Sequence, residues 1–145
     1  MVVAAVAGYS GTPLPRKLGI APGLRVAALN APGDYRELVA PWPEPAQLLA
    51  RADARTDLVH LFVVERAVLA KEAQRLRKLL EPDAVLWVSW PKKAAKVATD
   101  ITEDVIREVV LPMGWVDVKV CAVDGVWSGL KLVVRKELRA RAGEL

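Results

Sequence analysis

The chain has 145 residues, of which 53% are hydrophobic and 26% charged, with a formal net charge of +4 and one cysteine, Cys121. A chain of this length and composition buries enough apolar surface to fold around one core, which excludes an intrinsically disordered protein. The lone cysteine excludes an intramolecular disulfide, and the small positive charge falls short of the basic stripe typical of nucleic-acid-binding domains.

These bounds predict one domain over residues 1–145, with residues 1–11 and 137–145 frayed. Nothing in the cysteine content requires an oxidising compartment, so we expect a cytoplasmic protein. The opening run from Met1 to Ala7 is apolar but far shorter than the ~20 residues that cross a membrane. We therefore expect no association with a membrane.

Two side chains with catalytic potential stand in apolar surroundings. His60 is the only histidine, so a histidine-based metal site or a Ser-His-Asp arrangement has one imidazole to draw on. Cys121 lies in a predicted strand with Lys119 on the same face. We interpret His60 as a hydrogen-bonded core histidine and Cys121 as a buried, inert thiol, and we expect no metal.

The first part of the chain alternates turn formers with short regular segments. Thr12 is placed to cap a short helix that ends at Gly19, and the pair Asp34 and Glu37 is typical of a capped helix start. Prolines at 41, 43 and 45 stop that second helix. The expected elements are a helix over 13–18, a strand over 24–29, a helix from 34 to about 41, and a short strand over 47–52.

The second part carries longer apolar segments. The continuous apolar run over 58–64 predicts a strand buried on both faces, and apolar positions at helical spacing predict a helix over 65–80. Thr102 is placed to cap a second helix over 102–113. The remaining expected elements are a buried strand over 84–90, two strands over 116–123 and 130–135 joined by a hairpin turn at 124–126, and a charged tail from 136.

The order of these elements predicts the fold class. Strands and helices alternate, and an antiparallel strand follows at the end, as in a three-layer α/β domain with a mostly parallel, Rossmann-like sheet. In such sheets, ligands bind beyond the carboxyl ends of the strands. We therefore looked for candidate site residues directly after the predicted strands.

Several stretches resemble known families. The succession Leu18-Gly19-Ile20, Pro22-Gly23, Arg25-Val26, Asp57-Leu58-Val59, Leu80-Glu81-Pro82-Asp83 and Val85-Leu86-Trp87-Val88 is similar to the framework of class I S-adenosylmethionine-dependent methyltransferases. The stretches Tyr9 to Pro13, Trp87 to Lys93 and Trp127 to Val133 resemble a family of small bacterial proteins described only as a domain of unknown function. The first resemblance implies the fold and S-adenosylmethionine as the cofactor to consider.

The loop after the first strand departs from the methyltransferase pattern. Those enzymes place a glycine-rich loop there, whereas this chain reads Asn30-Ala31-Pro32-Gly33, in which a methyl group is added and an N–H is removed. The resemblance implies that the donor lies over Asn30 and Pro32. Asp53, about 20 residues further on, stands at the usual spacing of the acid that contacts the ribose. The missing glycines disfavour this cofactor.

A group of lysines follows the strand over 84–90. Trp90 is expected as an aromatic wall, and Lys92, Lys93 and Lys96 as charge partners for an anionic small molecule. The alternative interpretation is a solvated lysine loop beside a core tryptophan. We use the name lysine loop for residues 92–96.

Three further residues are candidates near the same edge. Ser128 and Lys131 lie in the predicted hairpin and are expected to face the lysine loop, unless the hairpin only packs Trp127. Asp100 is the acid nearest the lysine loop and the first choice for a general base, although carboxylates at a helix start are also explained by the helix dipole.

Three functions stay open on the sequence alone. The first is a module that binds an anionic small molecule at the strand ends, and the second is an S-adenosylmethionine-dependent methyltransferase. The third is a protein or nucleic-acid interaction domain that uses Trp42, Trp90 and Trp127 as exposed anchors. The sequence does not specify the ligand, the reaction or the oligomeric state.

Overall fold

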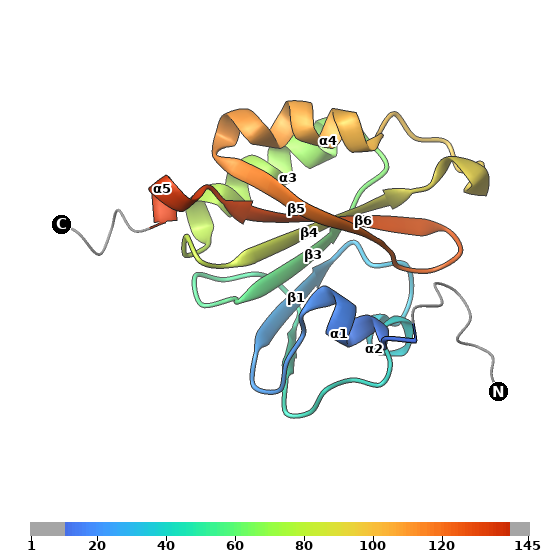
Figure 1. The fold of residues 1–145 in the computed structure, drawn as a ribbon, viewed down its shortest axis with the longest axis vertical. Coiled ribbons are helices and arrows are strands. Elements are labelled where there is room, and N and C mark those ends of the chain that lie inside the picture. Colours follow the sequence, from blue (N-terminus) through green and yellow to red (C-terminus); the bar gives the residue numbers. More distant parts are fainter. Residues whose placement is uncertain (1–10, 140–145) are drawn as a thin grey trace.

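The computed structural model describes residues 11–139, and its centre is one six-stranded sheet with the strand order β2-β1-β3-β4-β6-β5 (Figure 1). The expected fraying of residues 1–10 and 140–145 lies outside the described residues. The strands are β1 (Arg25–Leu29), β2 (Gln47–Leu49), β3 (Leu58–Phe62), β4 (Val85–Pro91), β5 (Trp115–Ala122) and β6 (Trp127–Val134).

The sheet is mostly parallel, as the sequence predicts. β1 pairs in parallel with β2 and β3, and β3 pairs in parallel with β4. β6 is antiparallel to both of its neighbours and lies between β4 and β5. The strands β1, β3 and β4 therefore all end at one edge of the sheet, after Leu29, Phe62 and Pro91, and we call this the carboxyl edge.

Helices cover both faces of the sheet and give the three predicted layers (Figure 1). The helices α1 (Leu14–Leu18) and α2 (Tyr35–Leu38) lie on one face, and α3 (Arg66–Leu79) and α4 (Glu103–Val110) on the other. The fully buried strand β3 contacts both layers, because its side chains alternate between the two faces of the sheet. Leu58 and Phe62 pack toward α1 and α2, whereas Val59 and Leu61 pack toward α3 and α4.

Side-chain caps define two of the helix starts. The Asp34 carboxylate accepts hydrogen bonds from the backbone N–H groups of Arg36 and Glu37, and the Thr102 hydroxyl accepts one from Val105. Both caps are as predicted. The cap of α1 is Pro13 rather than Thr12, because the Pro13 carbonyl accepts the first helical bonds. Gly19 ends α1 with φ 82°, as expected.

The C-terminal segment differs from its prediction. Residues 136–139 form a short helix, α5 (Lys136–Arg139), instead of fraying from residue 137. Two backbone hydrogen bonds explain why this segment is ordered. The Leu138 N–H donates to the Arg135 carbonyl, and the Arg135 N–H donates to the Gly114 carbonyl. The short 3-10 helices η1 (Lys93–Ala95) and η2 (Leu111–Met113) complete the fold.

Within residues 11–139, every helix is too short or too polar to cross a bilayer.

Gly129 of β6 provides a test of the packing between β4 and β6. A Cβ atom at this position would lie 3.1 Å from the Ser89 hydroxyl and 3.2 Å from a ring carbon of Trp87, and both side chains are fully buried. We expect Gly129→Ala to lower the free energy of unfolding by about 1–3 kcal/mol, measured by urea denaturation.

Gly125, in the β5–β6 turn, is the matched control, because a Cβ atom there meets no heavy atom within 4 Å. We expect Gly125→Ala to change the stability by no more than about 0.5 kcal/mol. Equal losses in the two variants would contradict the close approach at Gly129.

Candidate functional site

The order of the strands reverses between β1 and β3. From β1 the chain moves to β2 on one side, and it returns to β3 on the other side. Leu29 aligns with Leu61, so the loops over 30–34 and 63–65 both leave the carboxyl edge beside each other. In open α/β sheets ligands bind at this place, and we call these two loops the switch point.

The first loop of the switch point is a tight turn that ends in a cap. Asn30 and Gly33 have φ values of 61° and 89°, in the left-handed region. The turn places the Asp34 carboxylate 2.9 Å from the Arg36 N–H and 3.4 Å from the Glu37 N–H. These donors are therefore already bound to a carboxylate and are not available to a phosphate group.

The second loop is fastened by the segment that follows the lysine loop. The Val64 carbonyl accepts hydrogen bonds from the Thr99 hydroxyl at 2.6 Å and from the Asp100 N–H at 3.3 Å. Asp100 in turn accepts a bond of 2.7 Å from the Arg66 N–H at the start of α3. Glu65 is exposed, and its carboxylate has no hydrogen-bond partner among the described residues.

This geometry revises the role of Asp100. The residue is the N-terminal cap of α3, supplied from a different segment of the chain, since the Glu65 side chain does not cap the helix. One oxygen of its carboxylate, Oδ1, is thus engaged by a backbone N–H, and a role as general base stays a prediction.

The lysine loop lies at the carboxyl edge, as expected, but its lysines are not equivalent. Lys92 is half-buried, and its ammonium group donates to the Asp124 carbonyl at 3.0 Å. Its backbone N–H donates to the Val126 carbonyl at 2.8 Å. Lys92 therefore fastens the loop to the tip of the β5–β6 hairpin, while Lys93 and Lys96 are exposed.

The other residues expected around the lysine loop are not brought together. Trp90 is only 8% exposed and packs into the apolar layer beneath α3 and α4, so it is neither a ligand wall nor an exposed anchor. Ser128 is opposite Trp90, whereas Lys131 is opposite Trp87. Because residues three apart on a strand point to opposite faces, Ser128 and Lys131 do not face one site.

Asp53 lies away from the switch point. Its carboxylate forms an ion pair of 2.8 Å with Arg25, the first residue of β1, and the Gln47 amide contacts the same guanidinium at 3.1 Å. Arg25 and Gln47 lie at the starts of their strands, and the strand starts form the edge of the sheet opposite the carboxyl edge. A hydrogen bond from the Arg55 N–H is the main cause that lowers the Asp53 pKa. The structure therefore does not support the expected ribose contact.

A buried hydrogen-bonded chain links three elements in the layer beneath α1 and α2. The Tyr35 hydroxyl of α2 is 2.7 Å from His60 Nδ1, and His60 Nε2 is 2.6 Å from the Ser89 hydroxyl of β4. Phe62 stacks on the imidazole at 4.2 Å between ring centroids. The expected core role of His60 is confirmed, but no pattern in the sequence indicates its partners, which are 25 and 29 residues away.

The burial of the hydrogen-bonded groups of Tyr35, His60 and Ser89 determines their protonation states and their reactivity. Desolvation lowers the pKa of His60 to about 3 and raises the pKa of Tyr35 above its ordinary value. The imidazole is thus neutral at physiological pH, with one nitrogen donating and the other accepting. Ser89 is fully buried, so its hydroxyl is not placed to attack a substrate, although the pair has the spacing of a nucleophile and its base.

Cys121 and possible metal ligands are the remaining candidates for reactive chemistry. Cys121 is half-buried, and desolvation is the main cause that raises the pKa of its thiol. Over residues 11–139, no three His, Cys, Asp or Glu side chains are grouped so that they could hold a metal ion.

Solved structures similar to this chain include several methyltransferases. A SAM-dependent methyltransferase from Aquifex aeolicus superposes with a TM-score of 0.65 and 12% identity, over 83% of this chain and 87% of its own. A protein assigned to the type 11 methyltransferases from Sulfolobus solfataricus gives 0.60 and 11%, over 85% and 90%. The ribosomal protein L11 methylase from Lactobacillus delbrueckii gives 0.51 and 13%, over 83% and 74%.

These superpositions establish the fold. No family model and no curated protein sequence matches the chain. The protein therefore has a class I methyltransferase-like scaffold, in agreement with the resemblance drawn from its sequence.

Neutral His60 makes the stability dependent on pH. Its pKa is about 3 in the folded protein against an ordinary value of 6.5, so the unfolded chain binds more protons between these values. The contribution of His60 to the free energy of unfolding is therefore most favourable above pH 6.5. It declines as the pH falls toward 3, at roughly 1.4 kcal/mol per pH unit. Urea denaturation between pH 7 and about 4.5 should show this slope.

The variant His60→Gln keeps a side chain that donates and accepts but does not titrate. We expect it to be less stable at pH 7 and to show a shallower decline in stability as the pH falls. A decline as steep as that of the original protein would assign the pH dependence to other groups.

Asp100 provides a separate test of its capping role. Asp100→Ala leaves the Arg66 N–H without its partner, and we expect a loss of about 0.5–2 kcal/mol in the free energy of unfolding. Asp83→Ala is the control, because Asp83 is also exposed but has no side-chain partner among the described residues. Equal stabilities of the two variants would contradict the cap.

Proposed function

We propose that this protein is a reduced class I methyltransferase domain that binds S-adenosylmethionine at the switch point. The observation that carries the proposal is the reversal of strand order between β1 and β3, in a chain whose fold is shared with SAM-dependent methyltransferases. Ligands of such folds sit where neighbouring loops diverge at the carboxyl edge.

The charges at the switch point favour this ligand over a phosphate-bearing one. Asp34 and Glu65 put a carboxylate on each of the two loops, and Asp34 occupies the N–H groups of Arg36 and Glu37 at the start of α2. A nucleotide or coenzyme A would bring phosphates next to these carboxylates. S-adenosylmethionine carries a sulfonium, an ammonium and a carboxylate group and no phosphate, so its net positive charge is complementary to these two carboxylates.

The structure also weakens the objection raised by the loop sequence. Ala31 packs against the apolar layer beneath α1 and α2, so its methyl group is accommodated in the protein. Asn30, Pro32 and Gly33 are exposed in the turn. Asn30, Pro32 and Glu65 are the residues that would hold the cofactor, and the Asn30 amide supplies hydrogen-bonding groups that Pro32 lacks.

The cofactor would supply a transferable methyl group, and the chain's own residues limit the acceptor. His60 is buried and is not available as a base, and one oxygen of Asp100 is engaged as a cap. An acceptor that is nucleophilic without deprotonation therefore fits this edge best. Lys93 and Lys96 are exposed at the same edge and suit an acceptor with negative charge.

Isothermal titration with S-adenosylmethionine, S-adenosylhomocysteine and ATP tests the proposal. Glu65→Gln removes one exposed charge, and we expect it to weaken S-adenosylmethionine binding by roughly 2- to 5-fold. S-adenosylhomocysteine lacks the sulfonium charge, so its affinity should change less.

Glu81→Gln is the matched control, because Glu81 is exposed near the opposite end of α3. It should bind both compounds as the original protein does. Absence of saturable binding at millimolar ligand, or tighter binding of ATP than of S-adenosylmethionine, would overturn the proposal, and the second result would favour an anion site at the lysine loop.

A further inference from the structure

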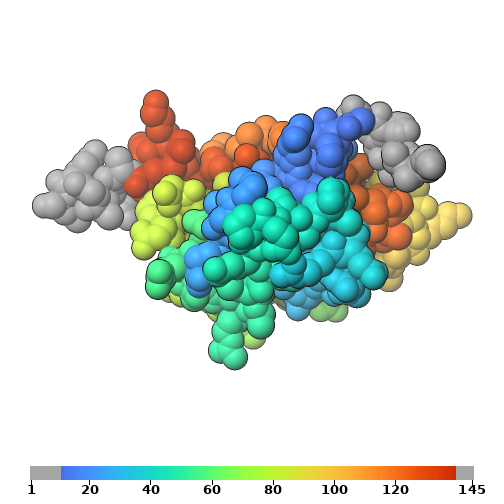
Figure 2. Space-filling view, turned by 90° about the horizontal axis from the view of Figure 1, so that it is seen from below, coloured from blue at the N-terminus to red at the C-terminus, as the bar shows by residue number. Residues whose placement is uncertain are grey.

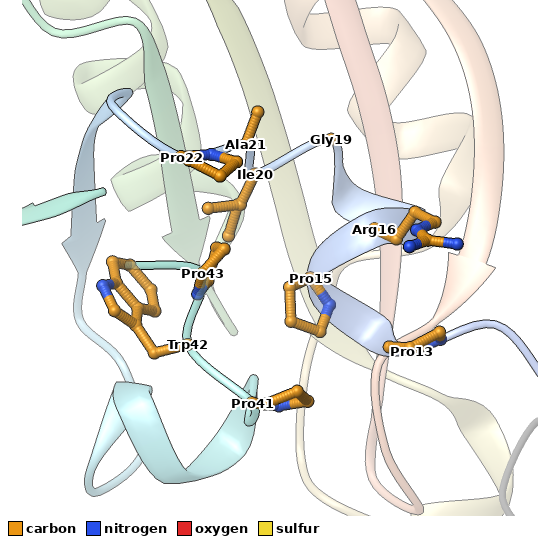
Figure 3. Close-up of a pocket in the computed structure, with 10 residues that line it drawn as sticks. All are labelled: Pro13, Pro15, Arg16, Gly19, Ile20, Ala21, Pro22, Pro41, Trp42 and Pro43. Atoms are coloured by element: carbon orange, nitrogen blue, oxygen red, sulfur yellow. The ribbon is translucent and has the colours of Figure 1, made fainter. Parts of the chain in front are cut away.

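An apolar pocket of about 470 Å³ lies between the segment that contains α1 and the segment that leads into β2 (Figure 3). Its volume is within the range of roughly 300–1,000 Å³ usual for small-ligand sites. The lining residues are Pro13, Pro15, Arg16, Gly19, Ile20, Ala21, Pro22, Pro41, Trp42 and Pro43.

This pocket is separate from the switch point. All of its lining residues precede β1 or β2, and none belongs to the loops that follow β1 or β3. Figure 2 views the molecule from the side of α1, where the blue segment around α1 meets the teal segment that precedes β2. Binding at this pocket is therefore independent of binding at the switch point.

The backbone of the pocket offers few hydrogen-bonding groups. Half of the lining residues are prolines, which have no N–H. Their carbonyls are largely used in local turns: Pro13 accepts from Arg16, Pro15 accepts from Ile20 at 2.8 Å, and Pro43 accepts from Ala46 at 2.9 Å. Sugars, nucleotides and extended peptides need many such groups, so the walls fit a hydrocarbon body better.

Trp42 is a fixed aromatic wall of the pocket. Its Nε1 donates to the Ala46 carbonyl at 2.9 Å, and the Arg36 guanidinium lies 4.9 Å from its ring centroid. Tyr35 packs against it edge to face. The indole is thus held in position before any ligand arrives, which lowers the ordering cost of binding.

Arg16 is the one charged residue that lines the pocket. It is exposed, and the described part of the chain provides its guanidinium with no ion pair or hydrogen bond. A guanidinium binds a carboxylate through two parallel hydrogen bonds. The pocket therefore has apolar walls and one guanidinium at its rim on α1, drawn turned away from Trp42 in Figure 3, which as an exposed side chain can rotate toward a bound anion.

We propose that this pocket binds a small, mostly apolar carboxylic acid. The apolar body lies between the proline rings and Trp42, and the carboxylate pairs with Arg16. An aliphatic and an aromatic acid share this chemistry, so the experiment includes both.

Titration of the full chain with octanoate, 2-naphthoate and 1-octanol, followed by calorimetry and tryptophan fluorescence, tests this site. We expect at least one of the two acids to bind saturably, and 1-octanol to bind roughly tenfold more weakly than octanoate because it lacks the charge. The tighter of the two acids identifies the aliphatic or aromatic class, and either result supports the proposal.

Two variants and one control assign the binding to the pocket. Arg16→Gln should reduce the affinity for octanoate to that for 1-octanol, whereas Lys17→Gln, at the next residue and outside the lining, should have little effect. Ala21→Leu places extra carbon atoms in the pocket and should weaken the binding of all three compounds. Thermal unfolding confirms that each variant is folded.

Three results would overturn the proposal. The first is the absence of saturable binding of either acid, and the second is equal binding of the acids by the original protein and Arg16→Gln. The third is self-association that Ala21→Leu abolishes, which would assign this surface to a contact between two copies of the chain.

Discussion

The hydrogen bonds of buried His60 hold the site-bearing part of the molecule together. α2 has only four residues, and a helix of this length has no stability of its own in water. Its position depends on Tyr35, whose hydroxyl binds His60 and whose ring packs on Trp42 and Phe62. The loop before α2 belongs to the switch point, and the segment after it forms one wall of the pocket. Both candidate sites are therefore held by the two buried hydrogen bonds of His60, which join α2, β3 and β4.

The sheet and its helices extend further on one side of these hydrogen bonds than on the other. Toward β4 the sheet continues through β6 and β5, with α3 and α4 packed on it. Toward β2 it ends in a strand of three residues, and the chain returns directly to β3. The common doubly wound order has a further strand outside the second one. A ligand at the switch point is thus bordered by regular structure on the β3 side and by short connections on the β2 side.

The residues that can be predicted from the sequence are those whose neighbours are local or whose pattern is periodic. Examples are the helix caps at Asp34 and Thr102 and the strand β3, which is buried on both faces. Asp53 shows the limit, because spacing along the chain does not reveal that the segment after β2 returns to the start of β1. The partners of His60 are equally invisible, since they come from distant elements. Ser128 and Lys131 were grouped by proximity in sequence, although strand alternation separates them.

The segment over residues 92–100, which contains the lysine loop, is fastened at both ends, by Lys92 to the β5–β6 hairpin and by Thr99 and Asp100 to Val64. The chain between these points has a short reach, and little conformational entropy remains for it to lose. An anion that contacts Lys93 or Lys96 would therefore meet charges already confined to a small volume. Because one of the fastening points is the carbonyl next to Glu65, a displacement of the loop would also be transmitted mechanically to the switch point.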